Sequence, residues 1–350
     1  MKRGILNHSK EELEKILAEY GIEKFRAKQL LVWIYRFGKA CFSEMTNIGK
    51  ELQKQLGEVF YIYRPKIIQT VKSTDGTIKF LLGLSDGCTI ECVFIPEEKR
   101  NTICVSSQIG CSVGCKFCNT GYHGFIRNLS TEEIISQLLV IKDYLNLWNT
   151  EDRLSNVVFM GMGEPLFNHE NILKAVYNLI LDEKDGISRR KITVSTSGIS
   201  PILKEIAKDL PCRLAISLHA PNDILRNRIM PINKIYNIAS ILDACLVYSS
   251  YHEYLKITFE YLLLGGINDS KECAHELLIL LKGINAKVNL LQFNSWDGCD
   301  FVPSTKRNVI QFAKILKDGG IEAPIRNRRG EDIMAACGQL ASRNSEIEGS

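Results

Sequence analysis

The feature that most constrains the fold is a six-fold alternation of β-rich runs with helical patterns beyond residue 100. Hydrophobic periodicity predicts strands near 102–107, 156–161, 191–196, 213–218, 256–263 and 287–293. It predicts helices near 130–145, 170–182, 201–209, 236–248, 270–282 and 306–317. Strands that alternate with helices pair in parallel and are covered by those helices, which indicates an α/β fold. The six βα units could close completely or remain an open, partial barrel.

The first hundred residues follow a different pattern. Apolar residues such as Leu13, Ile16 and Leu17 repeat at helical spacing, so we expect a small helical accessory domain over residues 1–60. Two β-rich runs flank Asp86-Gly87, a strong signal for a hairpin, within a β-rich linker over 61–100. We expect the main domain over 101–341 and a mobile polar tail over 342–350.

Composition limits the class of protein. Hydrophobic residues make up 45% and charged residues 24% of the chain, as in soluble globular proteins. The net charge of +4 is too small to indicate nucleic-acid binding by itself. No apolar run approaches the roughly 20 residues of a membrane helix, and the N-terminus lacks the apolar core of a secretory signal. We therefore expect a cytoplasmic protein without a membrane span, in which clustered cysteines hold metal or perform chemistry.

Three of the twelve cysteines form the pattern Cys111-x-x-x-Cys115-x-x-Cys118, directly after the first predicted strand of the barrel. The loop that leaves the carboxyl end of such a strand faces the functional mouth of the fold. A structural zinc ion requires a fourth ligand, for which His123 is the adjacent candidate. An iron–sulfur cluster uses the same thiolates, and three ligands would leave one iron open.

Longer motifs carry a resemblance. The cysteine triplet resembles that of the radical S-adenosylmethionine (SAM) superfamily. The stretches CVSSQIGCSVGCKFCNTG (104–121), FMGMGEP (159–165), VSTSG (194–198), AISLHAPND (215–223) and RGEDIMAACGQL (329–340) resemble, in the same order, the RlmN family of dual-specificity adenine-C2 methyltransferases. The resemblance implies a partial (β/α)6 radical SAM barrel and a [4Fe-4S] cluster held by the triplet. It also implies two molecules of SAM per turnover.

The resemblance assigns the SAM site to residues that follow the predicted strands. Gly163 and Glu164 would bind the amino group of SAM, since a carboxylate accepts well from an ammonium. The remaining contacts would come from Ser195, Ser217, Leu218, His219 and Asn294. Each has a simpler alternative: Glu164 could cap a helix, His219 could satisfy a buried backbone group, and Ser195 and Asn294 could end strands by local hydrogen bonds.

Two further cysteines gain roles from the family pattern. Carbon 2 of adenine is electron-poor and cannot attack the methyl group of SAM directly. The resemblance implies that Cys337 first accepts a methyl group from one SAM. The 5′-deoxyadenosyl radical from a second SAM then takes a hydrogen atom from that methyl group, and the resulting carbon radical adds to C2. Glu91 would remove the C2 proton, and Cys104 would release the RNA by forming a disulfide with Cys337. Glu91 shares a strand face with the apolar Val93 and Ile95, and the alternative is a surface glutamate on an edge strand.

The implied partners are 23S rRNA, tRNA with an adenine beside its anticodon, and a reducing electron donor such as flavodoxin or ferredoxin. We expect a monomer. Basic clusters at Arg189-Arg190-Lys191, at Arg226 and Arg228, and at Arg326, Arg328 and Arg329 are predicted phosphate contacts.

Two alternatives remain open at this point. A Cfr-type methyltransferase, which modifies C8 of adenine, shares the triplet and both working cysteines. A noncatalytic iron–sulfur or zinc protein that binds RNA would explain the triplet and the basic clusters, but not Cys104 and Cys337.

Overall fold

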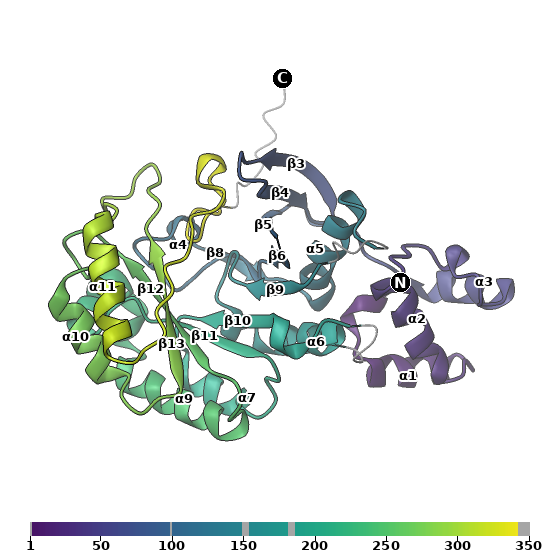
Figure 1. Ribbon diagram of the computed structural model, residues 1–350. Coiled ribbons are helices and arrows are strands. Elements are labelled where there is room, and N and C mark those ends of the chain that lie inside the picture. Colours follow the sequence, from purple (N-terminus) through teal and green to yellow (C-terminus); the bar gives the residue numbers. More distant parts are fainter. Residues whose placement is uncertain (1, 99, 149–153, 181–185, 342–350) are drawn as a thin grey trace.

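A single mixed sheet organises the chain, and the computed structural model describes residues 2–98, 100–148, 154–180 and 186–341. Within these residues the sheet has nine strands in the order β13-β12-β11-β10-β9-β6-β5-β4-β3 (Figure 1). Strands β6 and β9 to β13 pair in parallel. The two edges, β13 and β3, do not pair with each other, so the barrel is partial. The predicted tail 342–350 lies outside the described residues.

The six predicted βα units are confirmed. The parallel strands are β6 (Arg100–Cys104), β9 (Asn156–Phe159), β10 (Ile192–Thr196), β11 (Arg213–Ser217), β12 (Ile257–Leu263) and β13 (Ala286–Gln292). The covering helices are α5 (Thr131–Tyr144), α6 (His169–Ile180), α7 (Ser200–Ile206), α9 (Ile238–Tyr251), α10 (Lys271–Leu280) and α11 (Lys306–Asp318). After α11 the chain returns alongside β13, with parallel bridges from Lys287 to Glu322 and from Leu290 to Ile325.

An antiparallel ribbon extends the sheet beyond β6. The predicted hairpin is present as β4 (Ile78–Gly83) and β5 (Thr89–Glu97), and β5 pairs antiparallel with β6. Strand β3 (Lys66–Lys72), which the sequence did not predict, forms the outer edge. The hairpin is therefore continuous with the barrel sheet.

Short elements surround the carboxyl end of β6. Strands β7 (Gln108–Gly110) and β8 (Phe125–Asn128) form a small antiparallel pair around helix α4 (Asn119–Tyr122). Helix α8 (Asp223–Ile229) follows β11. These elements frame the cysteine triplet.

The predicted N-terminal helices are α1 (Lys10–Glu19), α2 (Phe25–Tyr35) and α3 (Lys50–Val59), which project to one side of the barrel (Figure 1). Strands β1 (Arg3–Gly4) and β2 (Phe60–Tyr61) pair and close this region. The Tyr61 hydroxyl donates to Glu132 at 2.8 Å, which connects the region to α5.

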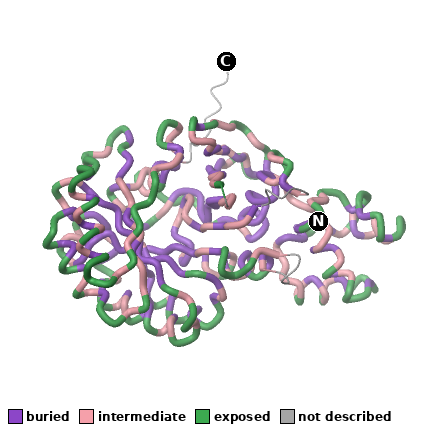
Figure 2. The backbone as a smooth tube through the Cα atoms, viewed as in Figure 1, coloured by how far each residue is buried: buried purple, intermediate pink, exposed green. Residues whose placement is uncertain are grey.

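The apolar core lies between the sheet and its helices. Alternate strand residues such as Ile103, Val157, Val194, Leu214 and Phe259 are at most 1% exposed, and Figure 2 shows the sheet as the buried centre of the chain. Because successive side chains of a strand point to opposite faces, the residues between them face the concave side. That inner face combines apolar side chains with polar ones such as Thr193, Glu260 and Asn289, and it lines a cavity. No helix in the described ranges is long and apolar enough to cross a membrane.

Candidate active site

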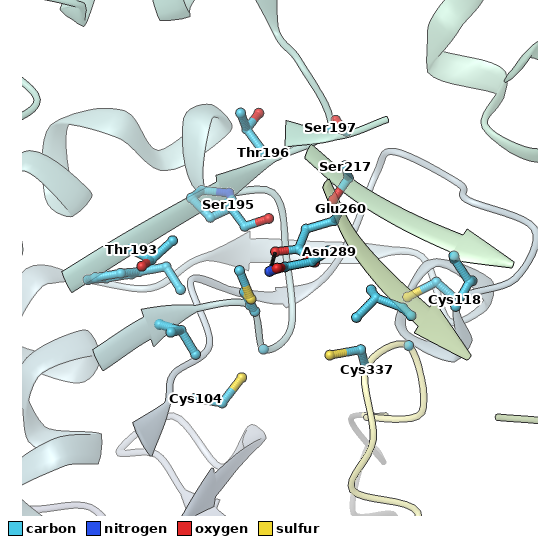
Figure 3. Close-up of a pocket in the computed structure, with 18 of the residues that line it drawn as sticks. Cys104, Cys118, Thr193, Ser195, Thr196, Ser197, Ser217, Glu260, Asn289 and Cys337 are labelled. Atoms are coloured by element: carbon cyan, nitrogen blue, oxygen red, sulfur yellow. Dashed lines mark hydrogen bonds between the residues drawn. The ribbon is translucent and has the colours of Figure 1, made fainter. Parts of the chain in front are cut away.

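A cavity of about 330 Å³ occupies the concave face of the partial barrel (Figure 3). It extends from the carboxyl ends of the parallel strands down to their amino ends, where Arg100 and Arg213 lie. Ten of the predicted site residues line it: Cys104, Cys111, Cys115, Cys118, Gly163, Glu164, Ser195, Ser217, His219 and Cys337. Glu91, Leu218 and Asn294 are not among the lining residues.

The cysteine triplet lies in the loop between β7 and α4. The backbone N–H of Cys111 donates to the Gly124 carbonyl at 2.7 Å, which folds the loop back on itself. Gly110 has a φ of +73°, and a Cβ there would lie 1.9 Å from that carbonyl oxygen, so the turn requires glycine. All three side chains consequently reach one cavity.

Burial raises the pKa of Cys111 to about 12 and that of Cys115 well above its usual range. Bound metal would displace these protons, since metals bind thiolates. No three His, Cys, Asp or Glu side chains in the described ranges surround one point closely enough for a single ion. Three thiolates can serve an iron–sulfur cluster, in which the ligands are distributed over several irons.

The segment that carries Cys337 is fixed to α4. The Asn119 N–H donates to the Gly338 carbonyl at 2.7 Å, and the Thr120 hydroxyl donates to the Leu340 carbonyl at 2.6 Å. Cys337 retains accessible surface and lines the cavity beside Cys118 (Figure 3). The C-terminal segment therefore forms one wall of the site.

Cys104 ends β6 and faces the same cavity as Cys337 (Figure 3). Burial raises the pKa of Cys104 far above its usual range, and the neighbouring Cys337 adds to the effect. Burial also raises the pKa of Cys337 to about 11; Glu260 raises it further, whereas Arg326 lowers it. All twelve cysteines are free thiols, so Cys104 and Cys337 are not bridged in this structure.

The GMGEP turn places Glu164 near the carboxyl ends of the parallel strands. Gly163 has a φ of +98°, and a Cβ there would lie 2.5 Å from the Gln108 side chain. The Glu164 carboxylate accepts from the N–H groups of Leu166 at 3.0 Å and Ser197 at 2.7 Å. It thus caps the short helical turn Pro165–Asn168, whereas the alternative expected it to cap the helix beginning near Asn168, which starts at His169; it also lines the cavity. Burial raises its pKa.

His219 supports its loop through one ring nitrogen. Its Nδ1 accepts from the Leu262 N–H at 3.0 Å, and burial lowers its pKa to about 3, so the ring is neutral. The proton must then be on Nε2, which is a donor for the cavity. The Leu218 side chain is fully buried in the core, so a contact from it to a ligand is not supported.

Two buried side-chain oxygens near the carboxyl ends of the strands lack a hydrogen-bond partner. They are Oδ1 of Asn294, which follows β13, and Oγ of Ser197, which lines the cavity. Buried polar atoms are normally paired, so both indicate a ligand with matching donors or acceptors.

The prediction that Arg226 contacts phosphate is wrong. Its side chain is fully buried, and it donates to the carbonyls of Ser217 and Leu218, each at 3.0 Å, and of Ser197 at 2.6 Å. It therefore joins the loops after β10 and β11. The other basic side chains differ: Arg326 lines the cavity, Arg328 pairs with Glu331 at 2.9 Å, and residues 189–191 are exposed.

The expected surroundings of Glu91 also need correction. Its carboxylate pairs with Lys79 at 3.0 Å and accepts from the Ala341 N–H at 3.0 Å, rather than facing only apolar neighbours. Strand β5 lies between β4 and β6, so Glu91 is not on an edge strand either. Its position places the carboxylate against the C-terminal segment.

Sequence reasoning missed the polar residues in the middle and at the amino ends of the strands. Glu260 and Asn289 line the cavity, together with Thr193, Arg213, Thr258 and Lys287. One signal was present: Glu260 interrupts the apolar run ITFEYLLL, where a buried strand was predicted. A charged residue within such a strand indicates an inward-facing function.

Two family models match the chain. Residues 4–62 match the N-terminal domain of the ribosomal RNA large subunit methyltransferase, and residues 105–278 match the radical SAM superfamily. The crystal structure of a radical SAM methyltransferase from Sphaerobacter thermophilus is 38% identical, with a TM-score of 0.88, over 97% of this chain and 99% of that one. The partial barrel, the cysteine loop and these matches define a radical SAM protein.

Curated relatives narrow the class. The dual-specificity RNA methyltransferase RlmN of Rhodospirillum rubrum is 44% identical over 95% of this chain and 79% of its own length. That of Gluconobacter oxydans is 43% identical over 98% and 86%. The chain belongs to the RlmN family.

Proposed function

We propose that this protein transfers a methyl group from SAM to C2 of adenine in 23S rRNA and in tRNA, at the adenine next to the anticodon. The observation that carries the proposal is that Cys104 and Cys337 face the same cavity as the cysteine triplet (Figure 3). A protein that only bound RNA would have no need for this arrangement. Relatives named dual-specificity RNA methyltransferase favour C2 over the Cfr-type C8 reaction.

The residues present fit both cofactors. Cys111, Cys115 and Cys118 would hold a [4Fe-4S] cluster. Burial raises the pKa of Cys115 well above its usual range, and the buried cation of Arg226 offsets part of that rise. When bound, the cluster supplies the electron that cleaves SAM reductively. We assign SAM to Gly163, Glu164, Ser195, Ser217 and His219 on the cavity wall, and to Asn294, whose Oδ1 is unpartnered. Two molecules of SAM would be consumed per turnover.

Three side chains would then act on the methyl group and the RNA. Cys337 would accept the methyl group as a thiolate. Burial raises the pKa of its thiol to about 11, and Arg326 opposes part of that rise. Cys104 is protonated in the resting protein, because burial raises its pKa, and must lose that proton before it attacks the sulfur of Cys337. Glu91 would remove the C2 proton, which requires its contact with Ala341 to open.

Electrons would come from a flavodoxin or ferredoxin. A second pocket lies on the other side of the cysteine loop and includes Cys115, Cys118, Lys116, Arg228 and Trp296 in its lining. Its two cations suit an acidic electron carrier, although Asp300 also lines it. We propose that the donor docks there.

The proposed organisation follows the predicted boundaries. Residues 1–60 would form the accessory domain, 61–100 the β-rich linker and 101–341 the catalytic core. Because the proposed substrates are ribosomal RNA and tRNA, we place the protein in the cytoplasm. We also propose that it acts as a monomer.

Nucleoside analysis tests the proposal. The anaerobically reconstituted protein is incubated with SAM, a reductant and either 23S rRNA or tRNA that lacks the modification, and the digested RNA is analysed by mass spectrometry. We expect 2-methyladenosine in both RNAs. A product of 8-methyladenosine would support the Cfr-type reaction, and unmodified RNA with a loaded cluster would support a binding protein.

A further inference from the structure

Glu260 and Asn289 form a polar pair in the middle of the cavity. Glu260 is 5% exposed and lies directly opposite Asn289 in the parallel register of β12 and β13. The Asn289 amide donates to Oε1 of Glu260 at 2.9 Å, and Figure 3 shows both side chains in the cavity. A buried carboxyl group costs free energy unless it is hydrogen-bonded or paired, and the Asn289 amide offsets part of this cost for Glu260.

The pair has unused hydrogen-bonding capacity. Oδ1 of Asn289 is buried and has no hydrogen-bond partner. Asn289 bonds Oε1 of Glu260, which leaves Oε2 available to a ligand. Asn289 Oδ1 can accept a hydrogen bond, and the protonated Glu260 carboxyl group beside it can donate one. Together they match a ligand that has a donor next to an acceptor. The Watson–Crick edge of adenine has this pattern, with N1 as acceptor and the N6 amino group as donor.

The pair extends the cavity wall from the proposed SAM residues towards β13. Glu260 is the register partner of Ser217 across β11 and β12, and Asn289 lies one strand further away, on β13. Glu260 and Cys337 line the same cavity, and the Glu260 charge raises the pKa of the Cys337 thiol. A base bound to the pair would therefore share the cavity with the sulfur that carries the methyl group.

Cations mark a route to the pair from the other end of the cavity. Arg213 is the first residue of β11, Lys287 is the second residue of β13, and both line the cavity with Arg326. Arg100, the first residue of β6, also lines it but is ion-paired with Glu97. Cations such as Arg213, Lys287 and Arg326 bind phosphate. A nucleotide that entered here would direct its flipped base towards Glu260, as base-modifying enzymes require.

We propose that Glu260 and Asn289 form the subsite that reads the target adenine, with the Glu260 acid donating to N1 and Asn289 Oδ1 accepting from the N6 amino group. This inference rests on the proposed function and names how that site selects its base. C2 is bonded to N1, so donation to N1 withdraws electron density from C2 and orients it for addition of the carbon radical.

The protonation state of Glu260 suits this role. Burial raises its pKa to about 7, while the Asn289 hydrogen bond and the charges of Arg326 and Lys287 lower it. The acid form donates to N1, whereas the carboxylate above that pKa opposes the N1 lone pair. Adenine binding should therefore weaken as the pH rises through 7. The other titratable or charged groups that face the cavity are Glu97, Arg100, Cys104, Glu164, Arg213, His219, Cys337 and the triplet cysteines.

The test uses protein already methylated at Cys337, so that later steps are isolated. RNA affinity and single-turnover methylation are measured from pH 6 to pH 8 for the wild type, Glu260→Gln and Glu260→Ala. The wild type should lose about tenfold in both quantities, in line with one group of pKa near 7. Glu260→Gln donates at every pH and should show no such fall. Glu260→Ala should be about tenfold weaker throughout.

A second experiment compares Asn289→Ala with the wild type on two RNAs, one with the target adenine and one in which purine replaces it. The variant should lose about tenfold on adenine and nothing on purine, which lacks the N6 amino group. Cluster content should match the wild type in every variant, and methylation of Cys337 from SAM should not fall, since loss of the Glu260 charge can only lower the pKa of that thiol. Both measurements control for folding.

The outcomes are distinguishable. If the wild type methylates no RNA, the proposed function fails. If the wild type is active but Glu260→Gln keeps the pH-dependent fall, or Asn289→Ala loses equally on purine, the adenine subsite is wrong. Loss of SAM binding or of Cys337 methylation in these variants would assign the pair to SAM and also overturn the inference.

Discussion

The Glu91 carboxylate accepts a hydrogen bond from the backbone N–H of Ala341, with 3.0 Å between Oε2 and N. Ala341 ends the segment that carries Cys337, so the proposed base and the proposed methyl carrier are physically connected. Lys79 occupies the other carboxylate oxygen at 3.0 Å. Glu91 therefore holds the C-terminal segment in the resting protein and must release it in order to reach a substrate.

Removal of the methyl carrier should separate the two halves of the reaction. Cys337→Ala should abolish methylation of the protein and of the RNA but leave the visible absorbance of the cluster unchanged, because the triplet is intact. Peptide mass spectrometry should find methylcysteine at position 337 in the wild type. RNA methylation by Cys337→Ala would refute the carrier role.

Removal of the resolving thiol should trap the RNA. Cys104→Ala should accumulate a covalent protein–RNA species that migrates slowly in a denaturing gel and disappears on RNase treatment. Cys92→Ala, which changes a fully buried cysteine on the adjacent strand β5, is the matched control and should turn over normally. Normal turnover by Cys104→Ala would show that another group resolves the adduct.

Arg226 should contribute to both stability and SAM affinity. A lysine cannot donate to the carbonyls of Ser197, Ser217 and Leu218 together, so Arg226→Lys should lower the free energy of unfolding by about 3 kcal/mol. Urea denaturation and SAM titration measure the two effects. Arg228→Lys, two positions further and exposed, should change stability by at most about 0.5 kcal/mol. Equal effects of both variants would contradict the anchoring role.

The docking pocket predicts a selective electron-transfer defect. Lys116→Glu combined with Arg228→Glu should slow cluster reduction by an acidic flavodoxin several-fold, since steering by opposite charges is lost. Reduction by dithionite should be unchanged, as should the behaviour of Lys282→Glu, an exposed charge reversal next to α10. A uniform slowing with both reductants would point to damage at the cluster instead.

The sequence predicted the barrel because its buried parallel strands are short apolar runs that alternate with amphipathic helices. It did not predict β3, whose residues are exposed or half-buried on both faces and so lack a clear alternation. The cysteines and rim residues were identifiable from motifs. Glu260 was not predicted as a site residue, because its role depends on which face of β12 points into the cavity. Arg226 was wrongly predicted to contact phosphate, because loops distant in the sequence bury this helix position.

The inner face of the barrel has a consequence for how the protein tolerates change. Strand residues such as Val194 and Leu214 are fully buried in the outer layer, whereas polar residues such as Glu260 and Asn289 line the cavity on the inner face. Substitutions inside the chamber can therefore alter what is recognised or transformed without melting the scaffold. Substitutions of cavity residues could accordingly change the substrate or the reaction while the fold is retained.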